Sequence, residues 1–407
     1  MTDRLLPQTK KDVLDIIRAA IEDKQTLEII GAGSKCDWGR PVNSAALLDL
    51  TKLTGIMLYE PAELVLSAAA GTSMMEIQQA LAEENQQLAF EPPDFSLLYG
   101  GNNSGTLGGT IAANLSGSKR LQAGAARDHF LGFEAVSGRG EQFKSGGRVV
   151  KNVTGFDLSK LLAGSFGTLA AMTSVTVKVL PKPDKTRTVL LYGLEDDAAI
   201  KALSKALQGP FEINSAAHLP ANIAVRSSLS YVASSGGSVA AVRVQGPGPS
   251  VEVRCRAIRA LWQASGDVDE LHGHNSDILW QEVRDIANFL SNAEDQIWRL
   301  SVPPSAGAGV VAAIASQLDG EFYYDWGGGL IWLAVAANAG NSATIIRQAV
   351  DNSSGHATLV RASAELRSNV DVFHPQPAEL ARLSRNIKSS FDPAGVLNPG
   401  KMYKADG

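Results

Sequence analysis

The sequence predicts an α+β protein of two domains, with a C-terminal segment that returns to the first domain. Three observations predict this class. The 407 residues, 44% hydrophobic and 19% charged, are enough for two cores. Helix-like and strand-like patterns alternate along the chain. The pattern changes at Pro181-Lys182-Pro183, which we take as a domain boundary.

The first domain, residues 1–183, opens with alternating helices and short strands. Thr9 suits the N-cap of a first helix, and apolar residues at helical spacing indicate a second. The expected helices cover Lys10–Asp23 and Thr72–Glu84, and the expected strands cover Leu27–Ile30, Leu47–Leu50 and Leu64–Ala69.

The middle of this domain is dense in turn-forming residues. Gly, Asn, Ser and Pro crowd Phe90–Gly147, so we expect no regular helices there and a segment that wraps around a ligand. Leu158–Ala163 then reads as a buried helical turn, and Leu169–Leu180 as paired strands.

The second domain, residues 184–364, is expected to be an α+β domain of the ferredoxin-like kind. We expect Gly209–Ser238 to be a polar loop, and no internal repeat is evident. Within the C-terminal segment 365–407, the tail from Pro377 to Gly407 is expected to contain one helix, Ala378–Phe391. Further strands are expected at Thr188–Tyr192, Val239–Val244 and Ile331–Val335, and helices at Ala198–Leu207, Ser250–Ala264 and Ala343–Val350.

Composition excludes several classes of function. A net charge of -5, with no basic run, argues against a nucleic-acid partner. The start of the chain has no apolar targeting segment, and Leu161–Leu180 is interrupted by polar residues, so we expect a cytoplasmic protein without a membrane span. Contact with the inner membrane would be peripheral, through partner subunits. The two cysteines, Cys36 and Cys255, are too far apart to suggest an iron–sulfur or zinc site.

The first motif is a glycine loop directly after a strand, from Ile29 to Lys35. Small residues there let the backbone approach a diphosphate, with N–H groups pointing at the anion. Such a loop is more often an ordinary tight turn. It also lacks the third glycine and the later acidic residue of a Rossmann fingerprint, so we reject NAD binding.

A second motif, Gly105–Asn114, follows Glu91-Pro92-Pro93-Asp94. Gly108 and Gly109 would let the chain pass against a flat ring or a phosphate, while Thr106 and Asn114 offer hydrogen bonds. A glycine-rich surface loop is an equally good interpretation of this segment alone.

Two further motifs complete the pattern. The third comprises Arg127–Gly132, Gly146–Asp157 and Gly164–Leu169, and its order along the chain is the specific signal. The fourth runs from Phe391 to Met402, where Asp-Pro ends a helix and a fixed turn follows. We expect this turn to act as a C-terminal clamp whose polar contacts come from Asn398 and Lys401.

Together the four motifs resemble the PCMH-type FAD-binding domain of the vanillyl-alcohol oxidase superfamily, as found in bacterial D-lactate dehydrogenases and glycolate oxidase. The resemblance covers residues 5–183 and 365–404. It implies a bound FAD whose pyrophosphate lies at the first motif, with the C-terminal Asn398 and Lys401 closing over the isoalloxazine. The implied pyrophosphate contacts are Gly31, Ala32, Gly33, Ser34 and Lys35, and the implied isoalloxazine and ribityl contacts are Pro92, Thr106, Leu107, Gly108, Gly109, Asn114, Arg127, Asp128 and Val175.

Flavin attachment is expected to be non-covalent. Members of this superfamily with a covalent flavin usually attach it through a His in the glycine loop or a Cys further along. Here Cys36 is the one cysteine near the loop, and we interpret it as a small buried residue.

The second domain departs from the catalytic members of the superfamily. Glycolate oxidase D subunits carry a His-x-Gly-Asp-Gly-Asn-x-His stretch, but Asp325 and Trp332 stand at the histidine positions here. A Glu-His-Gly-Ile-Gly signature is also absent, with Gly355–Arg361 near its place. This pattern resembles E subunits of glycolate oxidase. It implies an electron-relaying FAD subunit that works with a sister FAD subunit and an iron–sulfur subunit on a small 2-hydroxyacid, oxidising glycolate to glyoxylate.

Two alternatives stay open from the sequence. The chain could be a self-sufficient FAD-dependent dehydrogenase of another hydroxyacid or alcohol, or a non-catalytic subunit that binds FAD for assembly. Hydride removal from a hydroxyacid needs a base and a cation near the flavin. The candidates are His129, His356, His374, Arg127 and Arg361. Nothing in the sequence pairs the histidines with an orienting group, which favours a structural role for each of them.

Overall fold

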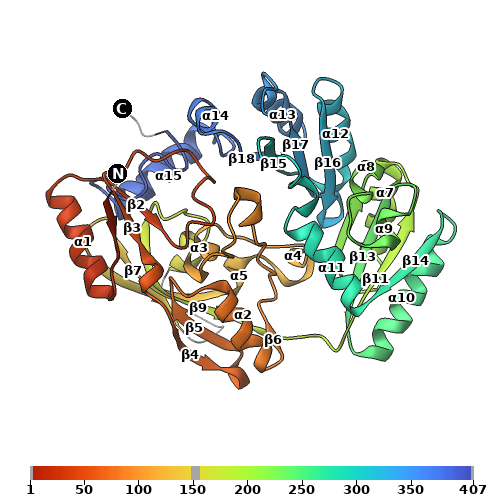
Figure 1. Ribbon diagram of the computed structural model, residues 1–407, viewed down its shortest axis with the longest axis horizontal. Coiled ribbons are helices and arrows are strands. Elements are labelled where there is room, and N and C mark those ends of the chain that lie inside the picture. The colour runs from red at the N-terminus through yellow and green to blue at the C-terminus, as the bar shows by residue number, and fades with distance from the viewer. Residues whose placement is uncertain (1–2, 148–155, 405–407) are drawn as a thin grey trace. The chain divides into compact units, whose positions relative to one another are not determined.

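The computed structural model describes residues 3–147 and 156–404, and its chain forms two compact units (Figure 1). The first unit consists of Met1–Ser116, Gly124–Lys182 and Arg367–Gly407, and the second of Gly117–Ala123 and Pro183–Leu366. Each unit contains both helices and sheets, which confirms the predicted α+β class.

A small parallel sheet opens the first unit. Its strand order is β1-β3-β2, and helix α1 packs on it through the buried side chains of Val13, Ile17 and Ala20. Thr9 caps α1 by accepting a hydrogen bond from the amide of Asp12, as predicted. The elements are β1 (Asp3–Leu5), α1 (Lys10–Glu22), β2 (Leu27–Ile30) and β3 (Ala46–Asp49).

A five-stranded antiparallel sheet, in the order β4-β5-β9-β7-β8, holds the larger core of the first unit. Its central strand β9 is buried over most of its length, and helices α2 and α3 add apolar side chains to the same core. The elements are β4 (Ile56–Glu60), β5 (Val65–Ala69), α2 (Met74–Glu83), α3 (Leu107–Ala112), α5 (Ala126–His129), β7 (Phe130–Ser137), β8 (Gln142–Gly146), α6 (Leu158–Leu162) and β9 (Ala170–Lys178). Two short strands, β6 (Gln86–Gln87) and β10 (Leu180–Pro181), pair with each other in a separate two-stranded sheet.

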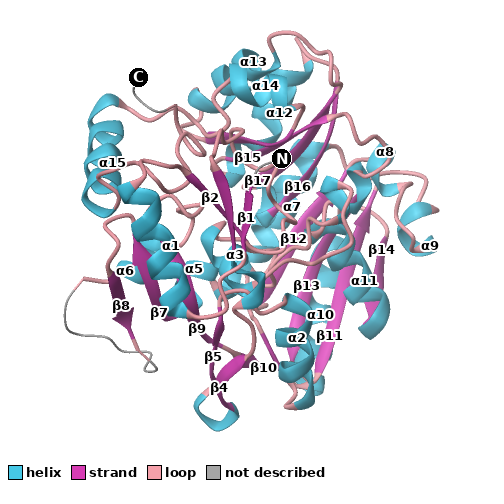
Figure 2. Cartoon of the chain, turned by 60° about the vertical axis from the view of Figure 1, so that its left-hand side comes forward, coloured by secondary structure: helices cyan, strands magenta, loops and turns pink. Residues whose placement is uncertain are grey.

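The C-terminal segment is part of the first unit. Helix α14 (Ala364–Asn369) is followed by α15 (Ala378–Phe391), which lies beside α1 and the small sheet in Figures 1 and 2. Beyond α15 the chain runs parallel to β2. The amide of Leu27 donates to the carbonyl of Val396 at 2.7 Å, and the amide of Asn398 donates to the carbonyl of Leu27 at 2.9 Å.

The second unit is built on one eight-stranded antiparallel sheet in the order β14-β11-β13-β12-β16-β17-β15-β18 (Figure 2). Two successive β-α-β-β-α-β segments form it, each with its strands in the same ferredoxin-like order. The first comprises β11 (Lys185–Tyr192), α7 (Asp196–Leu207), β12 (Ile213–Leu219), β13 (Val239–Gly246), α10 (Gly248–Trp262) and β14 (Val268–His272). The second comprises β15 (Gln296–Ser301), α12 (Gly307–Ala315), β16 (Gly320–Asp325), β17 (Leu330–Val335), α13 (Ser342–Asp351) and β18 (His356–Arg361).

The duplicated arrangement was not evident in the sequence, and two local predictions were wrong. Gly209–Ser238 is not a polar loop, because it contains the buried strand β12 and helices α8 (Ala221–Ala224) and α9 (Ser230–Ala233). Phe90–Gly147 contains three short α-helices, including α4 (Arg120–Ala123), a 3-10 helix at Leu97–Tyr99, and the strands β7 and β8. Within β12, Asn214 and Ser215 are buried yet satisfied by hydrogen bonds from Arg243, which explains their polar sequence.

No helix within residues 3–147 and 156–404 has both the length and the apolar character needed to cross a bilayer.

Gly71, between β5 and α2, tests the packing of the first unit. A Cβ atom there would lie 2.0 Å from the carbonyl oxygen of Leu50 and 2.8 Å from that of Leu53. Because backbone must move to relieve this contact, we expect Gly71→Ala to lower the free energy of unfolding by about 1–3 kcal/mol. Gly309→Ala, in α12 with nothing within 4 Å of the new Cβ, should instead raise it by up to about 1 kcal/mol. Urea unfolding measures both changes in free energy. A Gly71→Ala variant as stable as the wild type would contradict this packing.

Candidate functional site

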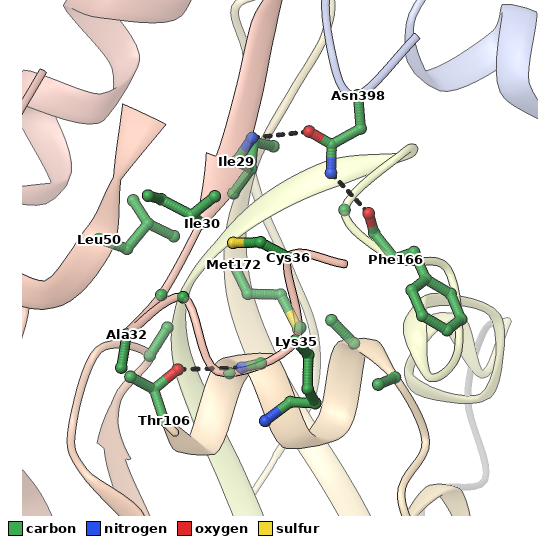
Figure 3. A pocket seen from close by; sticks show the side chains of 18 of the residues that line it. Ile29, Ile30, Ala32, Lys35, Cys36, Leu50, Thr106, Phe166, Met172 and Asn398 are labelled. Carbon is green, nitrogen blue, oxygen red and sulfur yellow. Dashed lines mark hydrogen bonds between the residues drawn. The ribbon is translucent and has the colours of Figure 1, made fainter. Parts of the chain in front are cut away.

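A cavity opens in the first unit where β2, α3 and the C-terminal segment meet (Figure 3). Its empty volume is about 790 Å³, counting the part open to solvent. Ten of the residues predicted from the sequence line it: Gly31, Ala32, Gly33, Ser34, Lys35, Thr106, Gly108, Gly109, Asn398 and Lys401.

The glycine loop forms one wall of the cavity. Gly31 must lack a side chain, because a Cβ atom there would lie 2.4 Å from Oγ1 of Thr106. Gly33 has a φ of 77°, a conformation that glycine adopts without strain. The amide N–H groups of residues 32–35 donate no hydrogen bond to any residue in the described part of the chain. Four successive free donors beside a cavity are suited to bind an anion.

Lys35 adds a positive charge to this loop. Its Nζ donates to Oγ of Ser34 at 2.9 Å and makes no ion pair with any carboxylate of the described residues. Burial lowers the pKa of Lys35 to about 8, against the opposing effect of Asp94. An ammonium group kept apart from carboxylates can offset the charge of a bound phosphate.

Helix α3 supplies the neighbouring wall. Thr106 is its N-cap, and its Oγ1 accepts a hydrogen bond from the amide of Gly109 at 3.2 Å. Gly108 lies against Ala70, where an added Cβ atom would come within 2.8 Å of both the Cβ and the carbonyl oxygen of Ala70. These contacts fix the helix close to the glycine loop and keep this wall of the cavity smooth.

Asn398 and Lys401 join the C-terminal segment to the cavity. The Oδ1 of Asn398 accepts from the amide of Ile29 at 2.6 Å, while its Nδ2 donates to the carbonyl of Phe166 at 2.6 Å (Figure 3). Nζ of Lys401 donates to the carbonyl of Cys36 at 2.7 Å and to Oε1 of Glu28 at 3.2 Å. Both side chains therefore hold β2, the glycine loop and the C-terminal segment together.

Six residues predicted for the site do not line the cavity. Leu107 and Val175 are fully buried in the hydrophobic core, and Pro92 is also buried. Asn114 accepts from the amide of Arg127 at 3.0 Å. Arg127 and Asp128 are exposed. The carboxylate of Asp128 accepts from the amide of Ala125 at 2.8 Å, at the start of α5. Leu107 and Val175 thus serve core packing, and Asp128 caps α5. In the third motif, Arg148–Gly155 lie outside the described residues.

Sequence reasoning missed most of the apolar wall. Small and apolar side chains complete the cavity: Leu50, Ala70, Ala112, Ala113, Ala170 and Met172. Nothing distinguishes such residues from ordinary core positions in a single sequence. Phe166 and Gly167, within the third motif, also line the cavity.

The cavity fits FAD by its own chemistry. A diphosphate would meet the free amides of the glycine loop and Lys35, and the apolar wall suits an aromatic ring. Cys36 also lines the cavity, and burial raises the pKa of its thiol, which disfavours the thiolate.

Comparisons with known proteins agree with this geometry. The family described as an FAD binding domain matches residues 4–146. The glycolate oxidase subunit GlcE of Escherichia coli is 32% identical over 96% of this chain and 96% of its own length. The glycolate oxidase subunit GlcD of Bacillus subtilis is 24% identical over 99% of this chain and 89% of its length.

Similarity to solved structures supports the fold. The crystal structure of p-cresol methylhydroxylase superposes with a TM-score of 0.70 at 14% identity, covering 99% of this chain and 90% of that one. This likeness establishes a PCMH-type architecture. Taken with the identity to GlcE over nearly the whole of both chains, it means that this chain belongs to the family of FAD-dependent oxidoreductase subunits that includes GlcE.

Proposed function

We propose that the chain is the FAD-binding, electron-relaying subunit of a glycolate dehydrogenase complex. In this complex it works with a sister flavoprotein and an iron–sulfur subunit to oxidise glycolate to glyoxylate, and it holds its FAD non-covalently. The observation that carries the proposal is the row of free amides beside Lys35 in a chain that matches GlcE over 96% of both chains. FAD supplies the two-electron acceptor, while the chain positions it.

The proposal requires an electron acceptor outside this chain. Cys36 and Cys255 are the two cysteines of the sequence, too few for an iron–sulfur cluster held by cysteines. The described residues also contain no group of three His, Cys, Asp or Glu side chains that could hold a metal ion. Electrons would therefore leave through a partner subunit.

The positions that carry histidines in D subunits serve the fold here. Asp325 accepts hydrogen bonds from Oγ of Ser118 at 2.6 Å and from the amide of Trp326 at 2.7 Å. Trp332 is buried in β17. Arg361, another candidate, donates to the carbonyls of Asn292 and Asp295. These roles favour oxidation of the hydroxyacid on the sister subunit.

The test is an anaerobic spectrum of the purified chain with bound FAD. We expect no bleaching of the flavin absorbance when glycolate is added to the chain alone, and bleaching when the sister and iron–sulfur subunits are present. Prompt bleaching of the isolated chain would show a self-sufficient dehydrogenase. A flavin that stays oxidised in the active assembled complex would show a non-catalytic assembly subunit.

The pKa of Lys35 predicts how FAD affinity depends on pH. The free protein holds this pKa at about 8, and a bound diphosphate would raise it, so the protonated form binds more tightly. This gain in FAD affinity is present below a pH of about 8, the pKa of Lys35 in the free protein, and is lost as the pH rises through that value. We expect the Kd for FAD to increase about tenfold between about pH 7 and pH 9. Equilibrium dialysis measures this, and the same slope in Lys35→Met would exclude Lys35 as its source.

A further inference from the structure

Two arginine side chains of the second unit contact one tryptophan ring. The guanidinium carbon of Arg120 lies 4.5 Å from the ring centroid of Trp326, and that of Arg299 lies 5.1 Å from the same centroid. Both distances are typical of cation–π contacts. Two guanidinium groups that share one ring repel each other, so a negative group beside them would be stabilising.

Arg299 is not directly paired with a carboxylate within the described residues. It makes no hydrogen bond and no ion pair there, although its side chain is half-buried. Asp325 is the acid that acts on it electrostatically, but both carboxylate oxygens of Asp325 already accept the hydrogen bonds from Ser118 and Trp326. Burial and the charge of Arg120 lower the pKa of Arg299 to about 10. Its donors are therefore available to a ligand.

The surrounding strands and the Gly117–Ala123 segment fix this arrangement. Arg299 of β15 lies directly opposite Thr358 of β18, so the two side chains share one face of the sheet. The hydroxyl of Thr358 makes no hydrogen bond within the described residues. On the other side, Nε1 of Trp326 donates to the carbonyl of Gly117 at 3.2 Å. That bond and the bond from Ser118 to Asp325 hold the start of α4, which carries Arg120.

We propose that Arg299 and Arg120 bind the carboxylate of a small organic anion beside the ring of Trp326. A planar carboxylate matches the paired donors of a guanidinium group, and the ring offers an apolar surface to the carbon atoms next to it. Arg120 is exposed, so an anion can reach it from solvent. None of these residues lines the FAD cavity. The site does not depend on the proposed function, although a 2-hydroxyacid belongs to this ligand class.

Isothermal titration of the full chain with its FAD bound tests the site. Acetate is the main probe, because it has a carboxylate and no hydroxyl to oxidise, so binding is separated from turnover. We expect saturable binding of acetate and glycolate and none of the neutral glycolamide. Arg299→Leu should weaken acetate binding about tenfold or more. The affinity of Arg299→Lys for acetate should lie between those of the wild type and Arg299→Leu.

Two further variants keep the test decisive. Arg347→Leu is the matched control, because its guanidinium carbon lies 5.5 Å from the ring of a different tryptophan, Trp298, and it should leave acetate binding unchanged. Arg120→Leu removes an exposed side chain and should weaken binding even if Arg299→Leu does not fold. Unchanged acetate binding in both Arg120→Leu and Arg299→Leu, equal binding of glycolamide, or phosphate binding as tight as acetate would overturn the proposal.

Discussion

We expect Asp392→Ala to release FAD and to destabilise the first unit. The carboxylate of Asp392 is fully buried, where it accepts from the amides of Val396 at 3.0 Å and Leu397 at 2.9 Å and pairs with Nζ of Lys388. Removing it leaves two buried amides without an acceptor and deprives the Lys388 ammonium of its carboxylate, although Nζ keeps the carbonyls of Thr168 and Leu397 as acceptors. Because the Lys388 side chain is 28% exposed, we expect a loss of about 2–4 kcal/mol, below that of a fully buried pair.

FAD would be lost because the turn that Asp392 holds leads directly to Asn398 and Lys401. Urea unfolding at a fixed FAD concentration and the flavin absorbance after gel filtration measure the two effects. Glu379→Ala is the matched control, since Glu379 is an exposed carboxylate at the start of the same helix, α15, and should change stability by less than about 0.5 kcal/mol. Retention of full flavin content in Asp392→Ala would mean that this turn does not support the cavity.

Lys35→Met should weaken FAD binding without unfolding the protein. A hydrogen bond to a charged group contributes about 1.5–3 kcal/mol, which corresponds to an increase in Kd of about 10- to 100-fold. Burial already disfavours the lysine charge in the free protein, so an apolar side chain of similar length should be tolerated. Equilibrium dialysis below about pH 8, where the lysine is protonated, is the measurement.

Lys52→Met provides the control for that substitution. Lys52 is an exposed lysine of the same unit that does not line the cavity, and its replacement should leave the Kd for FAD unchanged. Equal weakening by both substitutions would point to the net charge of the unit as the cause. No weakening by Lys35→Met would place the diphosphate elsewhere.

The sequence predicted elements well where their ends are chemically marked. Helix α15 has the predicted bounds, because Pro377 precedes it and Asp392-Pro393 ends it. The glycine loop after β2 was also predicted, since Gly31 and Gly33 are required there by close approach and by a positive φ.

Other features depend on contacts between distant parts of the chain. Strand β12 reads as polar because Asn214 and Ser215 look solvent-exposed until Arg243, on the neighbouring strand, is known to satisfy them. The same holds for the cavity wall, where Ala112 and Met172 resemble ordinary core residues. The duplicated β-α-β-β-α-β arrangement could not be predicted, because its two halves share a strand order but no evident repeat in sequence.

The most direct test of the central claim, that the glycine loop and Lys35 hold the diphosphate of FAD, compares FAD with riboflavin. Riboflavin has the same isoalloxazine ring and no phosphate, so its affinity reports the apolar wall alone. We expect Lys35→Met to raise the Kd for FAD about 10- to 100-fold and to leave the Kd for riboflavin nearly unchanged. Equal losses of affinity for both ligands would contradict the claim, because Lys35 would then support the cavity as a whole and not the diphosphate.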